Sequence, residues 1–363
     1  MSLYLNESLQ DRVITFDPSS ARKQFSSVRR SGSDELSIFE KLPLQSGKTA
    51  AQFVFGGNSF YESARTRLGG PDWPLFWLQG DVCPGTQISG AQAFLPEEAE
   101  VRYIELDGRI VGSYWEDADA EYSLLAGILP ASLNVTRGEQ TYSSFEQIEA
   151  ALGKVGFDFS HVARTWLYLD KLLDWYDDFN EARTSFFQSR GVFDRLTPAS
   201  TGIGASNPAG AALTSGALAI RPKHDGVVIR EVSSPLQCEA TEYRSSFSRA
   251  VEVAFPARRY VTISGTASIA PGGETLYVGD VVKQIHLTLD VVEAILNSRG
   301  YKWTDAVRAI GYFRDINDLP VFDAICRERG IAPLPLVPAH AIVCRDNLLF
   351  EIELDALAAG NYE

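Results

Sequence analysis

The sequence predicts an α+β fold of two tandem domains, each a mixed β-sheet with helices packed on one face. Three observations predict it. The chain has 363 residues, which is too long for one small domain. Its second half repeats a pattern from its first half. In both copies a run with helical spacing of apolar residues is followed by a run with strand character, as in α+β domains.

The internal duplication lies in residues 148–172 and 292–316, "IEAALGKVGFDFSHVARTWLYLDKL" and "VEAILNSRGYKWTDAVRAIGYFRDI". At one constant offset the two stretches align identical residues, among them Gly156 with Gly300, Arg164 with Arg308, and Tyr168 with Tyr312. Each stretch predicts an amphipathic helix, a stop at the glycine, and a strand.

In the second copy, apolar residues recur at helical spacing and should face a sheet. They are Ile285, Leu289, Val292 and Leu296. A second helix is predicted within residues 174–191 and 319–330, each closed by a glycine at the C-cap. With the flanking strands, each copy is predicted to run β-β-α-β-α-β-β.

Upstream of the helices, "LFWLQGDVCPG" and "VTISGTASIAPGG" are similar, with Gly80 opposite Gly265. This alignment predicts an insertion in the first copy, including a hairpin in "VRYIELDGRIVGSYW" with an Asp-Gly turn. The predicted domains are an N-terminal arm (1–46), a first domain with the hairpin insertion (47–225) and a second domain (226–363).

Residues 344–354, "CRDNLLFEIEL", predict a hairpin with a two-residue turn at Asp346-Asn347. Strand alternation puts Phe350, Ile352 and Leu354 on a core face, and Glu351 and Glu353 on the other. That second face is either solvated or functional. No Asp or Glu occurs between Asp194 and Asp225 in the first copy. Since a solvated face tolerates charge in both copies, the asymmetry favours a functional carboxylate.

Composition excludes several classes of protein. The net charge of −14 argues against nucleic acid and anionic membranes as partners. No run approaches a membrane span, and the first residues do not resemble a signal peptide, so a cytoplasmic location is expected. The four cysteines lack CxxC spacing and the four histidines are scattered, so neither disulfides nor a metal site is expected.

The second copy resembles the Rid (YjgF, chorismate mutase-like) fold through "YRSSFSRAVEV", "YVTISGTASIAP" and "LLFEIELDAL". Over residues 50–358 the chain is similar to the chorismatase family, through "ARTWLYLDKLLDWYDDFNEAR" and "PASTGIGASNPAGAAL". The resemblance implies two Rid-like domains, no cofactor, and loss of the enolpyruvyl group of chorismate as pyruvate. The implied ring product is 3-hydroxybenzoate, 4-hydroxybenzoate or a dihydroxycyclohexadiene carboxylate.

The resemblance also implies that Glu351 is the proton donor. Cleavage of a vinyl ether begins with protonation of its methylene carbon, which needs an acid that is still protonated near neutral pH. A glutamate reaches that state through burial or nearby negative charge, and a cleft between the domains would supply both. The first domain would then be non-catalytic and the second would carry the active site. Glu353 is expected to lie at the cleft edge or in solvent.

The expected substrate-binding residues surround this acid. Arg345 and Arg249 match the two carboxylates of chorismate, although a surface ion pair is the alternative for each. Gly265 lets backbone N–H groups approach a ligand, or forms only a bulge. Ser264, Thr266, Ala267 and Tyr243 complete the expected wall from the second domain, and Thr201 and Gly202 form it from the first.

Cys344 is expected on the same face as Glu351. It is either a small buried apolar residue or a thiol that steers the intermediate toward an aromatic product. The second reading, together with the resemblance, favours 3-hydroxybenzoate.

The rival functions are a Rid-type imine or enamine hydrolase and a non-catalytic small-molecule binding protein. Imine hydrolysis is disfavoured because His340 appears where Rid deaminases carry an arginine. The expected partner is chorismate, bound by a monomer or a homotrimer.

Overall fold

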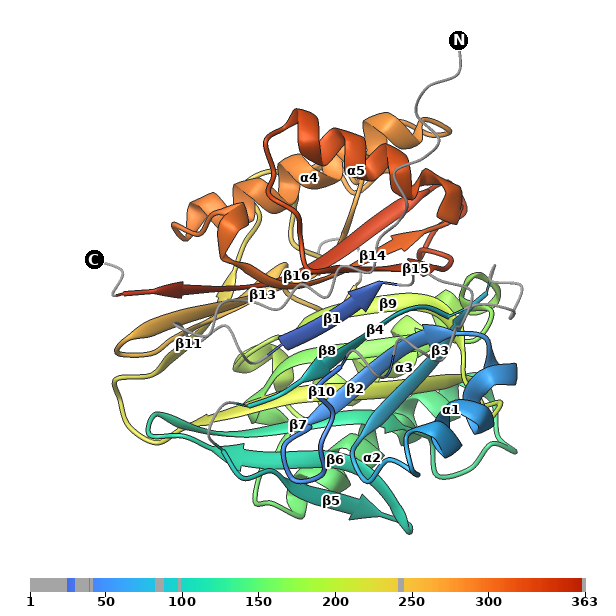
Figure 1. Ribbon diagram of the computed structural model, residues 1–363, viewed down its shortest axis with the longest axis vertical. Coiled ribbons are helices and arrows are strands. Elements are labelled where there is room, and N and C mark those ends of the chain that lie inside the picture. Colours follow the sequence, from blue (N-terminus) through green and yellow to red (C-terminus); the bar gives the residue numbers. More distant parts are fainter. Residues whose placement is uncertain are drawn as a thin grey trace.

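The computed structural model describes residues 25–29, 39, 42–81, 88–96, 99–240 and 245–360. Within these residues the strands form two sheets (Figure 1). In spatial order the first sheet is β1-β4-β2-β3-β9-β8-β10-β7-β6-β5 and the second is β11-β12-β13-β16-β14-β15. The predicted α+β class, with helices against mixed sheets, is confirmed.

The strands of the first sheet are β1 (Phe25–Arg29), β2 (Ala51–Gly56), β3 (Leu75–Gly80), β4 (Ile88–Phe94), β5 (Arg102–Leu106), β6 (Arg109–Glu116), β7 (Ala120–Ile128), β8 (Val162–Leu169), β9 (Ala199–Ser206) and β10 (Leu213–Pro222). Those of the second are β11 (Val228–Val232), β12 (Ala250–Ala254), β13 (Arg258–Ala267), β14 (Ala306–Phe313), β15 (Leu336–His340) and β16 (Phe350–Ala359). The α-helices are α1 (Tyr61–Arg67), α2 (Arg137–Gly153), α3 (Tyr176–Ser189), α4 (Val281–Ser298) and α5 (Leu319–Glu328).

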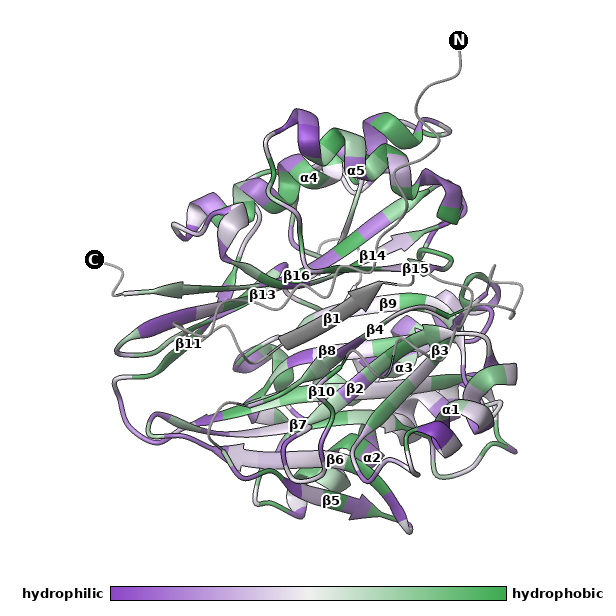
Figure 2. Ribbon diagram, viewed as in Figure 1, coloured by the Kyte–Doolittle hydropathy of each residue, from purple (hydrophilic) through white to green (hydrophobic). Residues whose placement is uncertain are grey.

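The second copy has the predicted order of elements, β12-β13-α4-β14-α5-β15-β16. The four apolar residues predicted on α4 are all buried, so this helix packs on the sheet as expected. Helices α4 and α5 alternate between hydrophilic and hydrophobic residues, with one face in the core and one outside (Figure 2). The glycines predicted to stop the helices, Gly156, Gly191, Gly300 and Gly330, all have positive φ, the left-handed conformation that glycine adopts without strain.

The first copy repeats this arrangement, but not where the sequence placed it. Strands β5 and β6 lie beside β7 as β11 and β12 lie beside β13. The predicted hairpin insertion is therefore part of the repeat, and the alignment of Gly80 with Gly265 is wrong, because β7 occupies the position of β13. The added elements are β1 to β4 and α1, which extend the first sheet beyond β9. Alternating segments look alike locally, and only pairing distinguishes an insertion from a repeat.

The two sheets pack face to face. A single hydrophobic cluster joins Phe53 and Trp166 of the first sheet to Ile310 and Val337 of the second. Helices α2 and α3 pack on the outer face of the first sheet, and α4 and α5 on that of the second (Figure 1). Side chains on the inner face of β16 therefore point toward the first domain. We propose that the domain boundaries lie after residues 46 and 225.

The predicted hairpin before β16 is wrong. β15 pairs in parallel with β14, whereas β16 lies between β13 and β14. The turn itself is present, since Leu348 N donates to Arg345 O at 3.1 Å. Because α5 returns the chain to an edge of the sheet, residues 341–349 must cross β14 to reach β16. This crossing segment carries Cys344 and Arg345.

Candidate active site

A cavity of about 1580 Å³ lies between the two domains. Helix α3 and strand β9 of the first domain form one side of it. Strands β13 and β16, the segment before β12 and the segment 341–349 form the other. Seven residues predicted for the site line this cavity: Gly202, Arg249, Gly265, Ala267, Cys344, Arg345 and Glu351.

Glu351 lies on the inner face of β16, opposite Ala267 of β13 and Tyr312 of β14. Its side chain lines the cavity although the residue is only 5% exposed. Burial raises the pKa of its carboxyl from the ordinary 4.5 to about 8, and the negative charge of Glu353 adds to this against the opposing charges of Arg164 and Arg249. Glu351 is therefore protonated at neutral pH and can act as a general acid.

Gly265 makes room for this carboxyl. The register of β13 against β16 shifts between Ile263 and Thr266, so a bulge is present as well as a close approach. A Cβ at position 265 would lie 3.0 Å from Cδ of Glu351, and closer still to Oε1. The glycine is required by the space that the acid occupies.

Replacing Gly265 with alanine is expected to lower kcat by at least about tenfold, because the methyl group displaces the carboxyl and small errors of position are costly in catalysis. Steady-state kinetics of the purified variant measure this. Gly153→Ala is the matched control, because Gly153 lies at the end of α2, outside the cavity wall, and a Cβ there would meet nothing within 4 Å. Equal losses in both variants would contradict this explanation.

Cys344 is half-buried in the cavity wall. Burial raises the pKa of its thiol to about 12, and the negative charge of Glu351 adds to this, while Arg345 and a hydrogen bond with Tyr176 act in the opposite direction. The thiol is neutral at pH 7, so Cys344 is placed as a polarisable contact and weak donor rather than as a thiolate nucleophile.

Two arginines bring positive charge to the wall. Arg249 donates from Nε and Nη2 to Cys238 O at 2.9 and 2.6 Å. Arg345 donates from Nη1 to Gly273 O at 2.7 Å. Backbone carbonyls thus orient both guanidinium groups, which suits them to bind a carboxylate in the cavity.

The sequence did not single out the contribution of α3. Tyr176, Asn180 and Arg183 line the cavity from the first domain, and Arg183 Nη2 donates to Asn180 Oδ1 at 2.6 Å. The segment "DWYDDFN" carries the family resemblance, but its residue pattern alone does not assign these side chains to the site. Its residues reach the cavity only because the domains pack through their sheets.

Three predicted substrate-binding residues lie outside the cavity wall. Ser264 Oγ donates to Ser248 O, and Thr266 Oγ1 donates to Ser264 O, so neither hydroxyl proton is directed at a ligand. Thr201 Oγ1 accepts from Gly265 N at 3.0 Å and from Arg164 Nη2 at 2.5 Å. These residues support the wall from beneath, which corrects their predicted role. Tyr243 lies outside the described residues.

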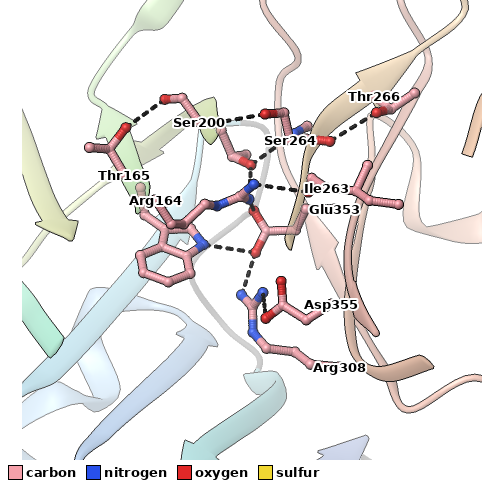
Figure 3. Close-up of polar contacts among 12 residues, drawn as sticks. Arg164, Thr165, Ser200, Ile263, Ser264, Thr266, Arg308, Glu353 and Asp355 are labelled. Atoms are coloured by element: carbon pink, nitrogen blue, oxygen red, sulfur yellow. Dashed lines mark hydrogen bonds and ion pairs between the residues drawn. The ribbon is translucent and has the colours of Figure 1, made fainter. Parts of the chain in front are cut away.

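Glu353 occupies a buried network between the sheets (Figure 3). Its carboxylate accepts from Arg164 Nη2 at 2.9 Å, Trp166 Nε1 at 3.0 Å and Tyr312 OH at 3.3 Å, and it pairs with Arg308 Nη2. Burial alone would raise the pKa of Glu353, but Arg308 and Arg164 hold it below its ordinary value. Glu353 is thus a fully buried anion, neither solvated nor at the cleft edge.

Comparison with known proteins places this geometry in a family. Residues 239–359 match the family model described as Endoribonuclease L-PSP. A 3-hydroxybenzoate synthase from Streptomyces hygroscopicus is 31% identical over 265 residues, which cover 65% of this chain and 74% of that protein. The chain belongs to the chorismatase family. A chorismatase from the same organism is 28% identical over 235 residues, covering 58% of this chain and 64% of that protein.

The chorismatase fold extends over both domains. The crystal structure of a chorismatase matches 87% of this chain and 95% of its own with a TM-score of 0.66, at 20% identity. The family model, in contrast, matches only the second copy. Two further observations hold for the described part of the chain: no group of His, Cys, Asp and Glu could hold a metal ion, and no helix is long and apolar enough to cross a membrane.

Proposed function

We propose that this protein is a chorismatase that releases the enolpyruvyl group of chorismate as pyruvate and forms 3-hydroxybenzoate. The observation that carries the proposal is a buried, protonated Glu351 in the wall of an inter-domain cavity that two arginines also line. The 3-hydroxybenzoate synthase at 31% identity supports the choice of product.

The reaction begins when Glu351 protonates the terminal methylene carbon of the vinyl ether. The electron pair of the double bond forms the new C–H bond, and an oxocarbenium ion remains, which the Glu351 carboxylate stabilises. The bond between the ether oxygen and the ring carbon breaks, its electron pair stays on the oxygen, and pyruvate leaves. The oxygen of the neighbouring ring hydroxyl bonds to that carbon and loses its proton, which gives an epoxide. The epoxide opens at the carbon that first carried the hydroxyl, and the carbon that now holds the oxygen loses its proton, which passes to that oxygen, so 3-hydroxybenzoate and pyruvate together contain the atoms of chorismate. Simple hydrolysis instead adds one water and leaves the ring as a dihydroxycyclohexadiene carboxylate.

Arg249 and Arg345 are proposed to bind the carboxylates of chorismate, and Gly202 and Ala267 to form the wall around the ring. Chorismate is the only partner that we propose, with the chain acting as a monomer or a homotrimer. Among the described residues, Cys238, Cys326 and Cys344 form no disulfide, which supports the cytoplasmic location that we propose.

Incubation with chorismate, with pyruvate assayed and the ring product identified by mass spectrometry, tests the proposal. Pyruvate and 3-hydroxybenzoate in equal amounts are expected. Absence of pyruvate would overturn the proposal and favour an imine hydrolase or a binding protein.

Cys344→Ala is expected to retain pyruvate release within about tenfold while most of the ring product shifts to the dihydroxycyclohexadiene carboxylate. The thiol occupies space beside Glu351, and a methyl group there admits water to the intermediate. The product ratio from liquid chromatography measures the shift. Cys326→Ala, in the helix and sheet core of the second domain, should leave the ratio unchanged. An unchanged ratio in Cys344→Ala would remove the thiol from product selection.

A further inference from the structure

Two carboxyl groups lie side by side on the inner face of β16 in opposite surroundings. Glu351 and Glu353 are separated by one residue, and both are buried. The side chains of Arg164, Trp166, Arg308 and Tyr312 bind the carboxylate of Glu353, and that of Thr201 also hydrogen-bonds to it. None of the described residues donates a hydrogen bond to the carboxyl of Glu351. One carboxyl is held as an anion, and its neighbour is left without donors that would stabilise its charge.

The charges of the network balance. Arg164 and Arg308 carry two positive charges, and Glu353 and Asp355 carry two negative ones, with Arg308 Nη1 3.3 Å from Asp355 Oδ2. All four side chains are fully buried, so water screens them little. Within this balanced group Glu353 is the anion adjacent to Glu351 on the strand.

Among the charges that act on Glu351, that of Glu353 is the negative one that raises the pKa of its carboxyl. The neighbouring thiol and phenol are neutral at pH 7, because the pKa of Cys344 is about 12 and that of Tyr312 lies well above 10. Arg249 and Arg164 favour the ionised form of Glu351. Charged or titratable groups that line the same cavity from α3, strand β11, the segment before β12 and the segment before β16 are Tyr176, Asp177, Glu181, Arg183, Glu231, Glu239 and Arg345.

We propose that Glu353 is a positioning residue: clamped as an anion between Arg164 and Arg308, it keeps the adjacent Glu351 carboxyl protonated, and so ready to donate, at neutral pH. The inference rests on the proposed function and deepens it. The two arginines come from equivalent positions of the two copies, so the duplication supplies the clamp. The first domain thereby acts on the acid through Arg164 without contacting the substrate with that side chain.

Glu353→Gln tests the proposal through a pH profile. The wild-type kcat/KM should fall above about pH 8, as Glu351 loses its proton. Without the charge of Glu353, two arginines face only Asp355, and the excess positive charge favours ionised Glu351. The descending limb should move to lower pH by about one unit or more, the size of effect typical of a nearby charge. Activity should recover toward the wild-type value as the pH is lowered.

Arg164→Gln tests whether the descending limb of the pH profile can also be moved in the opposite direction. Removing a positive charge beside Glu351 should move the same limb to higher pH, although it disturbs the same network. If Glu353→Gln does not fold, the pH profile of Arg164→Gln tests the proposal, and a limb that does not move to higher pH would contradict it. Glu252→Gln is the matched control. Glu252 is likewise a fully buried, arginine-bound glutamate in the second sheet, but it lies outside the cavity wall. The descending limb of the Glu252→Gln pH profile should therefore match that of the wild type.

A titration of the carboxyl separates this inference from the proposed activity. In protein labelled with ¹³C at glutamate carboxyls, the Glu351 signal is assigned by its loss in Glu351→Gln and followed against pH. Its midpoint should fall in Glu353→Gln, whatever substrate the enzyme uses. Uniform loss of activity at every pH with unmoved midpoints would show that Glu353 is only structural and would overturn the proposal. Absence of pyruvate with moved midpoints would overturn the function alone.

Discussion

Glu351→Gln is expected to lower kcat for pyruvate release from chorismate by about 10²- to 10⁴-fold, the contribution of a general acid. Glutamine keeps the size of the side chain and its fit against Gly265, but it has no proton of suitable acidity for the methylene carbon. The remaining residues still bind the substrate, so KM should change little. Steady-state kinetics with a coupled pyruvate assay measure both constants.

The same variant should be at least as stable as the wild type. The folded protein holds the Glu351 proton up to about pH 8, whereas the unfolded chain releases it near 4.5. Between these values the folded state binds more protons, so the free energy of unfolding falls as the pH rises. Glutamine removes that loss, and the advantage of the variant should grow from about pH 5 to pH 8. Urea unfolding at several pH values checks it.

Glu181→Gln is the control for the catalytic effect. Glu181 also lines the cavity, but it is exposed on α3 and should change kcat by less than about threefold. Full activity in Glu351→Gln would remove Glu351 as the acid while leaving membership of the family intact. A lower stability of Glu351→Gln at pH 8 would contradict its raised pKa.

Arg308→Met is expected to lower the free energy of unfolding by about 3 to 5 kcal/mol, the cost of breaking a buried ion pair by removing one partner. Arg308 pairs with Glu353 and Asp355, and all three side chains are fully buried. Methionine fills part of the volume but leaves two carboxylates with less positive charge nearby. Urea unfolding at pH 7 measures the change.

Arg190→Met is the matched control. Arg190 pairs with Glu149 at 2.9 Å, but each side chain is 33% exposed, and such pairs contribute about 1 kcal/mol or less. A loss in Arg308→Met no larger than that of the control would show that the network contributes little to stability. The network would then be maintained for its effect on Glu351 alone.

The asymmetry between the two copies, first inferred from composition, is explained by the strand pairing. Tyr168 and Tyr312 are equivalent residues of the repeat, and their hydroxyls lie 3.2 Å apart. Across from Tyr312 lies Glu351, and across from Tyr168 lies Thr214. The first copy thus carries a hydroxyl where the second carries the acid. It contributes Arg164 and α3 to the site instead.

Much of the second domain could be predicted from local pattern. Apolar spacing predicted α4, and alternation predicted that Phe350 and Ile352 face the core while Glu351 faces the other way, because both depend on backbone geometry alone. The segment before β16 was mispredicted because a turn at Asp346-Asn347 does not reveal which strand follows in the sheet. The assignment of β5 and β6 as an insertion failed for the same reason.

The sequence by itself determined the duplication and the faces of β16, since these follow from periodicity and from comparing one copy with the other, and the family resemblance implied Glu351 as the acid. Only the tertiary structure decided that Glu353 is a clamped anion and Glu351 a neutral acid. The two residues have the same chemistry and the same strand face. Arginines that lie 189 and 45 residues away along the chain distinguish them: they reach the carboxyl of Glu353, whereas no residue that the structure describes donates to that of Glu351.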